Sequence, residues 1–170
     1  MSIKRIVIVM LFLSCTYCFA DFNAEVVNIV DGDTIDVLNK NGKILRIRLV
    51  GIDTPEIKQS FGDDAALYLK KLINKKSVTI ISRPSKNKPF TSDYYKRILG
   101  KVILNGKDIN LEMIRKGMAW HFKKYKKNQP IADRQSYNKA EYEAREKNIG
   151  LWKDVNPFPP WKWRKLNRGR

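Results

Sequence analysis

The first half of the chain contains three short stretches whose apolar positions have the spacing of β-strands. Residues 25–30 and 34–38 are rich in β-branched and apolar side chains and flank an Asp-Gly-Asp turn. In residues 45–49, leucine and isoleucine alternate with two arginines, the period of two that indicates a strand with one dry face. The sequence Asn-Lys-Asn-Gly at 39–42 is a hairpin signal between the second and third stretches. The pattern therefore predicts a meander of three strands.

Beyond the meander, helical and strand-like spacings alternate. A helix with a broad apolar stripe is expected to begin at Asp63 or Asp64, either of which can cap it, and to end near Asn74. This order of elements predicts an α+β fold, a five-stranded OB-fold β-barrel with about three packed helices. The remaining expected elements are strands at 77–82 and 97–104, a helix at 110–116 stopped by Gly117, and a helix at 133–148 closed by Gly150.

Residues 1–20 have the composition of a signal peptide. Lys4 and Arg5 form a positive start, residues 6–13 are an apolar run, and Cys-Phe-Ala at 18–20 resembles a cleavage site. The apolar run is short for a membrane span, which favours cleavage over a retained anchor. The residues before either cysteine are also a poor context for lipidation. We therefore expect an exported protein, periplasmic or secreted, with one folded domain at 21–160 and a basic C-terminal tail at 161–170.

The cysteine content excludes thiol chemistry in the folded domain, and the net charge favours an anionic partner. Both cysteines, Cys15 and Cys18, lie in the expected leader, so the rest of the sequence has no thiol for a disulfide, a metal site or a nucleophile. The chain has 34 Lys and Arg against 17 Asp and Glu, a formal net charge of +17. This excess favours nucleic acid or an anionic surface as partner, without choosing between them. A monomer is the default expectation.

Carboxylates and arginines gather in four short motifs between residues 31 and 97. Each motif alone is ordinary, because Asp-Gly-Asp-Thr is a good turn and Thr-Pro-Glu a common strand exit. The expected meander, however, can bring Asp33 beside Asp53, and two carboxylates with a main-chain carbonyl form part of an oxygen shell for a hard cation such as Ca²⁺. Glu56 is then placed to act as a general base. Arg48 and Arg97 can grip a phosphate and offset the charge that develops at a five-coordinate phosphorus.

These motifs closely resemble the thermonuclease family, which includes micrococcal (staphylococcal) nuclease. The resemblance covers nearly the whole chain after the leader and keeps the order of the family. The shared pieces are Asp-Gly-Asp-Thr (31–34), Arg-x-Arg-Leu (46–49), Gly-Ile-Asp-Thr-Pro-Glu (51–56), Asp-x-Tyr-x-Arg (93–97), Gly-Met-Ala-Trp (117–120), Gly-Leu-Trp (150–152) and the Pro-Pro-Trp-x-Trp-Arg ending (159–164) of bacterial members.

The resemblance implies a calcium site, a general base and two catalytic arginines. The family reaction is Ca²⁺-dependent hydrolysis of DNA and RNA on the 5′ side of the phosphodiester, which leaves 3′-phosphate ends. It needs no covalent enzyme intermediate, and therefore no nucleophilic side chain. The matching residues are Asp33, Asp53 and the Thr54 carbonyl for the metal, Glu56 for the base, and Arg48 and Arg97 for the arginines.

Two positions depart from the family pattern. The family usually has glycine immediately before the loop arginine, where this chain has Lys96, which either alters the turn or adds a phosphate contact. The family prototype has two tyrosines near the nucleotide, where this chain has Lys123 at the first position and Tyr125 at the second. We expect Lys123 and Tyr125, together with Lys124 and Tyr95, to contact the substrate.

The remaining aromatic and basic residues near the expected site receive simpler interpretations. His121 is the only histidine, and no catalytic role is expected for it because no Ser or Cys partner is implied. Trp120 and Phe122 are expected to pack the barrel against the last helix. The basic run 123–127 is expected to guide a nucleic-acid strand, although such runs are often simply solvated.

Two rival functions remain beside an exported nuclease that acts on DNA and RNA with little sequence preference. One is an OB-fold module that binds nucleic acid but has lost catalysis. The other is a basic protein that binds anionic envelope polymers without catalysing a reaction. A degenerate relative should have lost carboxylates or arginines, whereas this chain keeps all of them, which favours the enzyme.

Overall fold

A β-barrel forms the N-terminal two thirds of the computed structural model, which describes residues 20–86 and 88–167. The sheet order is β3-β2-β1-β5-β6-β7, and a parallel pairing of β3 with β6 closes it. The expected five-stranded OB-fold barrel of α+β class is therefore confirmed. Its strands are β1 (Ala20–Ile29), β2 (Thr34–Asn39), β3 (Ile44–Leu49), β5 (Ser77–Ser82) and β6 (Ile98–Leu104), with the short β7 (Lys107–Asp108) added at the edge.

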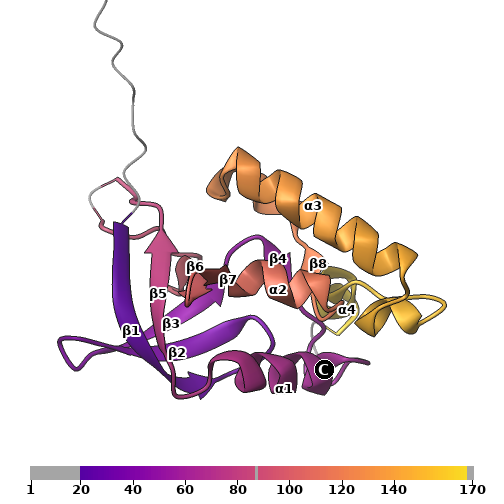
Figure 1. Cartoon of the computed structure of the whole chain (residues 1–170), viewed down its shortest axis with the longest axis horizontal. Helices are drawn as coiled ribbons and strands as arrows, with labels where there is room; N and C mark the ends of the chain where they lie inside the picture. Colours follow the sequence, from indigo (N-terminus) through magenta and orange to yellow (C-terminus); the bar gives the residue numbers. More distant parts are fainter. Residues whose placement is uncertain (1–19, 87, 168–170) are drawn as a thin grey trace, which may run out of the picture.

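Strand β1 is long because it serves two partners (Figure 1). Its first half pairs with β5 from Ala20 to Glu25, and its second half pairs with β2 from Ala24 to Ile29. The register shifts between Val26 and Asn28, and an irregularity of this kind bends a strand and increases its twist. The bend allows one strand to pass from one side of the barrel to the other, so that β3 and β6 can meet.

The inward side chains of the barrel strands form a dry core. The alternation seen in the sequence of β3 is realised, since Ile47 and Leu49 are buried while the two arginines between and before them point outward. Burial of this much apolar surface is the main favourable term in folding. The barrel side chains with no exposed surface are Val26, Ile35, Val37, Ile47, Leu49, Ile80 and Val102.

Among the described residues, four α-helices pack on or beside the barrel, where the sequence analysis expected about three. Figure 1 shows α1 along one side of the barrel, α2 at its end, and α3 packed beyond α2. The helices are α1 (Gly62–Ile73), α2 (Ile109–Arg115), α3 (Ile131–Glu146) and α4 (Pro160–Leu166), joined by the 3-10 helices η1 (Lys123–Asn128) and η2 (Gly150–Lys153) and by a two-strand pair, β4 (Ile52–Asp53) with β8 (Trp120–His121).

One expected helix cap needs correction, and the structure defines two further segments in more detail. Helix α1 begins at Gly62 with Phe61 at the N-cap, so Asp63 and Asp64 lie in its first turn, where they favour the helix dipole rather than cap it. The basic run 123–127 lies in 3-10 helix η1. The boundary set between residues 160 and 161 falls inside α4, so the segment after it continues a helix.

The expected leader, with both cysteines, lies outside the described residues apart from Ala20, which begins β1. Across residues 20–86 and 88–167, no helix combines the length and the apolar character that a membrane crossing requires.

Asn110 connects the barrel to the segment that carries the acidic residues. This side chain has no exposed surface, accepts a hydrogen bond from Val102 N at 3.0 Å, and donates to the carbonyls of Val50 (3.0 Å) and Gly100 (3.2 Å). Val50 directly follows β3 and Gly100 lies in β6. Asn110 therefore fixes the two strands whose parallel pairing closes the barrel.

We predict that Asn110→Ala lowers the free energy of unfolding by about 2–4 kcal/mol, because it leaves buried main-chain groups without their partner. Chemical denaturation followed by tryptophan fluorescence measures the change. The matched control is Asn41→Ala in the exposed β2–β3 turn, for which a change within about 0.5 kcal/mol is expected. Equal effects of the two substitutions would contradict a special role for Asn110.

Candidate active site

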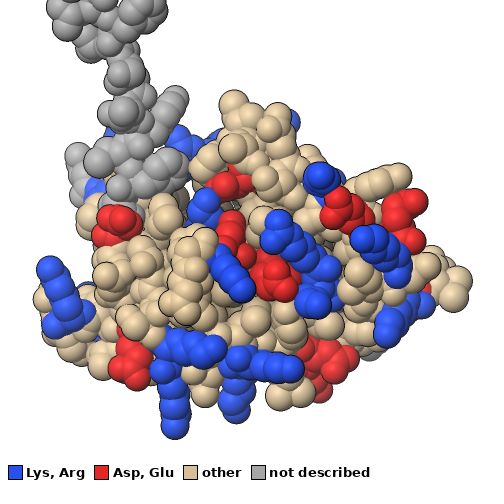
Figure 2. Space-filling view, in the orientation of Figure 1, with Lys and Arg blue, Asp and Glu red and all other residues tan. Residues whose placement is uncertain are grey.

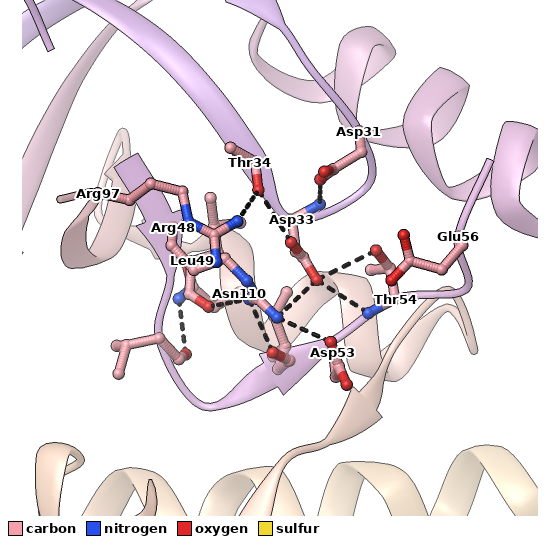
Figure 3. A network of polar contacts seen from close by, with 12 residues as sticks. Asp31, Asp33, Thr34, Arg48, Leu49, Asp53, Thr54, Glu56, Arg97 and Asn110 are labelled. Carbon is pink, nitrogen blue, oxygen red and sulfur yellow. Dashed lines mark hydrogen bonds and ion pairs between the residues drawn. The ribbon is translucent and has the colours of Figure 1, made fainter. Parts of the chain in front are cut away.

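Asp33 and Asp53 come from different strands and meet at one edge of the barrel. Asp33 immediately precedes β2 and Asp53 ends β4, and both are buried, with exposed fractions of 5% and 0%. The N–H and Oγ1 of Thr54 donate to Oδ2 of Asp33 at 3.0 and 3.2 Å, while Thr34 Oγ1 donates to Oδ1 at 3.1 Å. Figure 3 shows this network, in which Asp33 is held by main-chain and side-chain donors, and Asp53 by the side chain of Arg48. The predicted juxtaposition of the two aspartates is therefore present.

Gly32 makes this close approach possible. A Cβ at this position would lie 2.7 Å from Oγ1 of Thr54 and 2.8 Å from Cβ of Ala65 in α1. Real Cβ atoms do not approach other heavy atoms so closely, so any side chain would push the turn away from Thr54. The Asp-Gly-Asp turn therefore needs its glycine for packing against the second carboxylate-bearing segment.

Arg48 bridges the two aspartates. Its Nη2 atom lies 2.8 Å from Oδ2 of Asp33 and 2.8 Å from Oδ1 of Asp53. Its Nη1 atom donates to the carbonyls of Leu49 (2.7 Å) and Ile52 (2.9 Å), just before Asp53. A lysine ammonium has only three donors and no fixed plane, so it cannot make these four contacts together.

The carboxylates at this edge are crowded and poorly hydrated. Burial raises the pKa of the Asp53 carboxyl above its ordinary value, and ion pairs with Arg164 and Arg48 offset this only in part. Asp31 accepts a hydrogen bond from Asp33 N at 2.9 Å, and burial together with the charge of Asp33 raises the pKa of Asp31 to about 6. A further positive charge at this edge would therefore stabilise the ionised carboxylates of Asp31, Asp33 and Asp53.

The donor set fits a hard divalent cation. Calcium prefers oxygen ligands, and the buried carboxylates of Asp33 and Asp53, which both contact Arg48, would supply two of them. In the described part of the chain, no three His, Cys, Asp or Glu side chains cluster as a metal site. Beside the two carboxylates, the ligand set of a calcium ion would thus include other oxygens, such as the Thr54 carbonyl and water, which calcium accepts readily.

Glu56 lies next to this pair and faces solvent more openly. Its side chain is 38% exposed, and its Oε1 atom accepts a hydrogen bond from Nη1 of Arg164 at 2.6 Å. The main chain of Glu56 is fixed by Gln59, whose N–H donates to the Glu56 carbonyl at 2.7 Å. A Cβ at Gly62 would overlap that carbonyl, so α1 can begin against this segment only with glycine there.

Arg97 approaches the aspartates from the other side. In Figure 3 Arg97 and Glu56 lie on opposite sides of the Asp33 carboxylate. Asp93 accepts from Nε of Arg97 at 2.7 Å and from its main-chain N–H at 3.0 Å, while Nη1 of Arg97 donates to Oγ1 of Thr34 at 3.3 Å. Lys96 has φ 62°, the left-handed conformation that favours glycine, so this lysine adopts the turn instead of altering it.

The predicted substrate contacts and both arginines line one open cleft of about 1770 Å³. Tyr95 is 75% exposed and lies under the guanidinium of Arg97, 5.5 Å from it, and Tyr125 is 52% exposed. Lys123 is partly engaged, since its Nζ lies 3.1 Å from Oε2 of Glu141. Figure 2 shows basic side chains mixed with acidic ones on the face it presents, with no continuous basic surface there. The residues of this cleft named by the sequence analysis are Asp33, Arg48, Thr54, Glu56, Tyr95, Arg97, Lys123, Lys124 and Tyr125.

His121 has a structural environment. It is 4% exposed, and its ring nitrogens lie 3.0 Å from Oδ1 of Asn138 and 3.1 Å from Oε1 of Gln129. Trp120 packs edge-on against Trp152 and Trp161 rather than against the barrel, so it joins β8 to the C-terminal segments.

Arg164 is the main site residue that sequence reasoning did not assign. It lies in α4, more than a hundred residues after the carboxylates that it contacts, and the expected tail gave no reason to place it there. The signal that was available is its position in the Pro-Pro-Trp-Lys-Trp-Arg motif.

Comparison with known proteins agrees with this geometry. The family described as staphylococcal nuclease homologue matches residues 46–154. A protein named uncharacterized endonuclease from Escherichia coli is 38% identical over 162 residues, which cover 95% of this chain and 97% of the relative. A micrococcal nuclease of Shigella flexneri is 40% identical over 159 residues, covering 88% of this chain and 84% of the relative. The staphylococcal-like nuclease CAN1 of Arabidopsis thaliana is 40% identical over 127 residues, but these cover only 35% of that longer protein.

These matches define the class as nucleases built on an OB-fold barrel. The chain belongs to the staphylococcal nuclease family. The matched residues include Arg48, Asp53, Glu56 and Arg97, whereas Asp33 precedes them and Arg164 follows them.

We predict that Lys96→Gly stabilises the protein by about 0.5–1 kcal/mol, because relief of the left-handed strain outweighs the added freedom of glycine in the unfolded chain. Thermal or chemical unfolding measures the change. The control is Lys40→Gly, an exposed turn lysine without a positive φ, which is expected to be neutral or destabilising. A loss of stability in Lys96→Gly as large as in the control would show that the loop is unstrained.

Proposed function

We propose that the protein is an exported, calcium-dependent nuclease that hydrolyses phosphodiester bonds of DNA and RNA with little sequence preference and leaves 3′-phosphate ends. The observation that carries the proposal is the contact of Arg48 with both Asp33 and Asp53. An open cleft lies at this contact and is lined by Asp33, Arg48, Glu56 and Arg97, whereas Asp53 is fully buried. Membership of a nuclease family supports the same reaction class.

In this proposal each side chain has a separate task. Asp33, Asp53 and the Thr54 carbonyl hold calcium, which when bound polarises the phosphate and offsets its charge. Glu56 accepts a proton from the attacking water, a role suited to a carboxylate that is partly exposed beside the buried pair. The guanidinium groups of Arg48 and Arg97 neutralise the phosphate as negative charge develops on it.

A path for the nucleic-acid strand is proposed along the same cleft. Tyr95 and Tyr125 offer exposed rings on which bases can stack, and such stacking tolerates any sequence. Lys123 and Lys124 add positive charge beside Tyr125, which attracts the backbone electrostatically. Binding should therefore weaken as salt concentration rises.

Export and the monomeric state are part of the proposal. The support for export is the charged and apolar pattern of residues 1–20, and a closed barrel suits a monomer. The alternative of a catalytically inactive OB-fold binder is less favoured, because the carboxylates and arginines are all present and brought together.

Digestion of plasmid DNA, single-stranded DNA and RNA by the protein from residue 21 onward tests the proposal. Calcium should support cleavage, magnesium should replace it poorly, and EDTA should abolish cleavage. Glu56→Gln is expected to slow cleavage at least about 100-fold, because the proton acceptor is lost. The new 5′ ends should accept a label from a kinase without prior phosphatase treatment, as 5′-hydroxyl ends do.

The control variant is Glu25→Gln, an exposed position on β1 away from the cleft, which should cleave at the wild-type rate. Tight binding of nucleic acid without cleavage in any metal would overturn the enzyme and support the inactive binder. Cleavage that leaves 5′-phosphate ends would retain a nuclease but contradict the proposed chemistry.

A further inference from the structure

Helix α4 places a third guanidinium directly on the acidic residues of the site. Nη2 of Arg164 lies 2.8 Å from Oδ2 of Asp53, and Nη1 lies 3.1 Å from Oδ1 of Asp53 and 2.6 Å from Oε1 of Glu56. One side chain thus contacts both oxygens of a proposed metal ligand and one oxygen of the proposed general base. Bidentate pairing of this kind is the strong form of an arginine–carboxylate contact.

The position of Arg164 is held by several contacts of the C-terminal segment. Trp161 packs against Trp120 and Phe122, with ring centroids 5.4 and 5.7 Å away. Gln59, which also fixes the Glu56 turn, donates from Nε2 to the carbonyl of Phe158 just before α4. The segment after residue 160 is therefore docked through both aromatic and polar contacts, and it presents Arg164 to the site.

The contacts of Arg164 use the atoms that a cation and a proton acceptor need. Oδ1 of Asp53 already has Arg48 as a partner, and Oδ2 is taken by Arg164. An arginine and a calcium ion carry charge of the same sign, so they compete for the same carboxylate oxygens.

The side chain of Arg164 remains accessible to solvent while it contacts these partners. It is 42% exposed, whereas that of Arg48 is 13% exposed and makes four contacts with protein oxygens. Arg164 also lines the open cleft, so a guanidinium that leaves Asp53 enters solvent or meets a substrate phosphate. Release of Arg164 leaves Oδ2 of the buried Asp53 without this partner, so the release is favourable only when another cation takes its place.

We propose that Arg164 is an internal competitor of calcium, and that α4 is a latch which holds Asp53 and Glu56 in an inactive ion pair until calcium displaces the arginine. The inference rests on the proposed calcium dependence of the nuclease. Its consequence is that the protein needs a higher calcium concentration for activity than the same site would need without Arg164, because only the fraction with Arg164 released can bind the ion.

Calcium titration calorimetry in the absence of nucleic acid tests the latch separately from cleavage. Arg164→Gln removes the competing charge, and we expect the dissociation constant for calcium to fall roughly tenfold, which corresponds to about 1.4 kcal/mol. The matched control is Lys165→Gln, which makes the same charge change at the adjacent residue, and no salt bridge joins Lys165 to Asp53 or Glu56 in the described chain. This control should change the dissociation constant less than about twofold.

A second measurement follows Arg164 itself in the wild-type protein. The Nε–Hε NMR signal of this residue, assigned by its loss in Arg164→Gln, should move toward the position of exposed arginine side chains as calcium is added. Equal calcium affinities of wild type and Arg164→Gln, or weaker binding by the variant, would overturn the latch while the calcium site stands. No calcium binding by any variant would overturn the calcium site and the latch together.

Discussion

A single guanidinium nitrogen, Nη2 of Arg48, lies 2.8 Å from a carboxylate oxygen of Asp33 and 2.8 Å from one of Asp53. Two buried carboxylates repel each other unless positive charge lies between them. The rest of the site must therefore keep the negative charge of this pair compensated. Arg164 adds a second positive group at the outer side of Asp53. The same electrostatic demand that attracts these arginines also makes the site a good binder of a divalent cation.

The closure of the barrel places Arg48 where it can contact both aspartates. The parallel pairing of β3 with β6 places Arg48 opposite Leu99, next to the Arg97 loop, and Asn110 ties the end of β3 to β6. Thr54 then reaches back to Asp33 across the space left by Gly32. Charge compensation at the edge and closure of the barrel therefore support each other, because the strands that close the barrel carry the charged groups.

Much of this arrangement was predictable from the sequence because it depends on local patterns. The alternation in 45–49 predicted which face of β3 is buried. The Asp-Gly-Asp and Asp-Thr-Pro-Glu motifs predicted that Asp33 and Asp53 lie close together. The contact of Arg164 with Asp53 was not predictable in this way, because it joins positions 111 apart along the chain through the packing of Trp161. The positive φ of Lys96 was not predictable either, because lysine has no preference for this conformation. The turn in which Asp93 accepts a hydrogen bond from the Arg97 N–H imposes the positive φ.

The most direct test of the account measures how calcium changes the free energy of unfolding, in wild type and in Asp53→Asn, without nucleic acid. A ligand that binds the folded state stabilises it by about 2.7 kcal/mol at a concentration one hundred times its dissociation constant. The account predicts this rise for wild type and none for Asp53→Asn, in which the buried carboxylate pair is broken. An equal rise in both proteins would place the ion elsewhere, and no rise in wild type would contradict a calcium site at this pair.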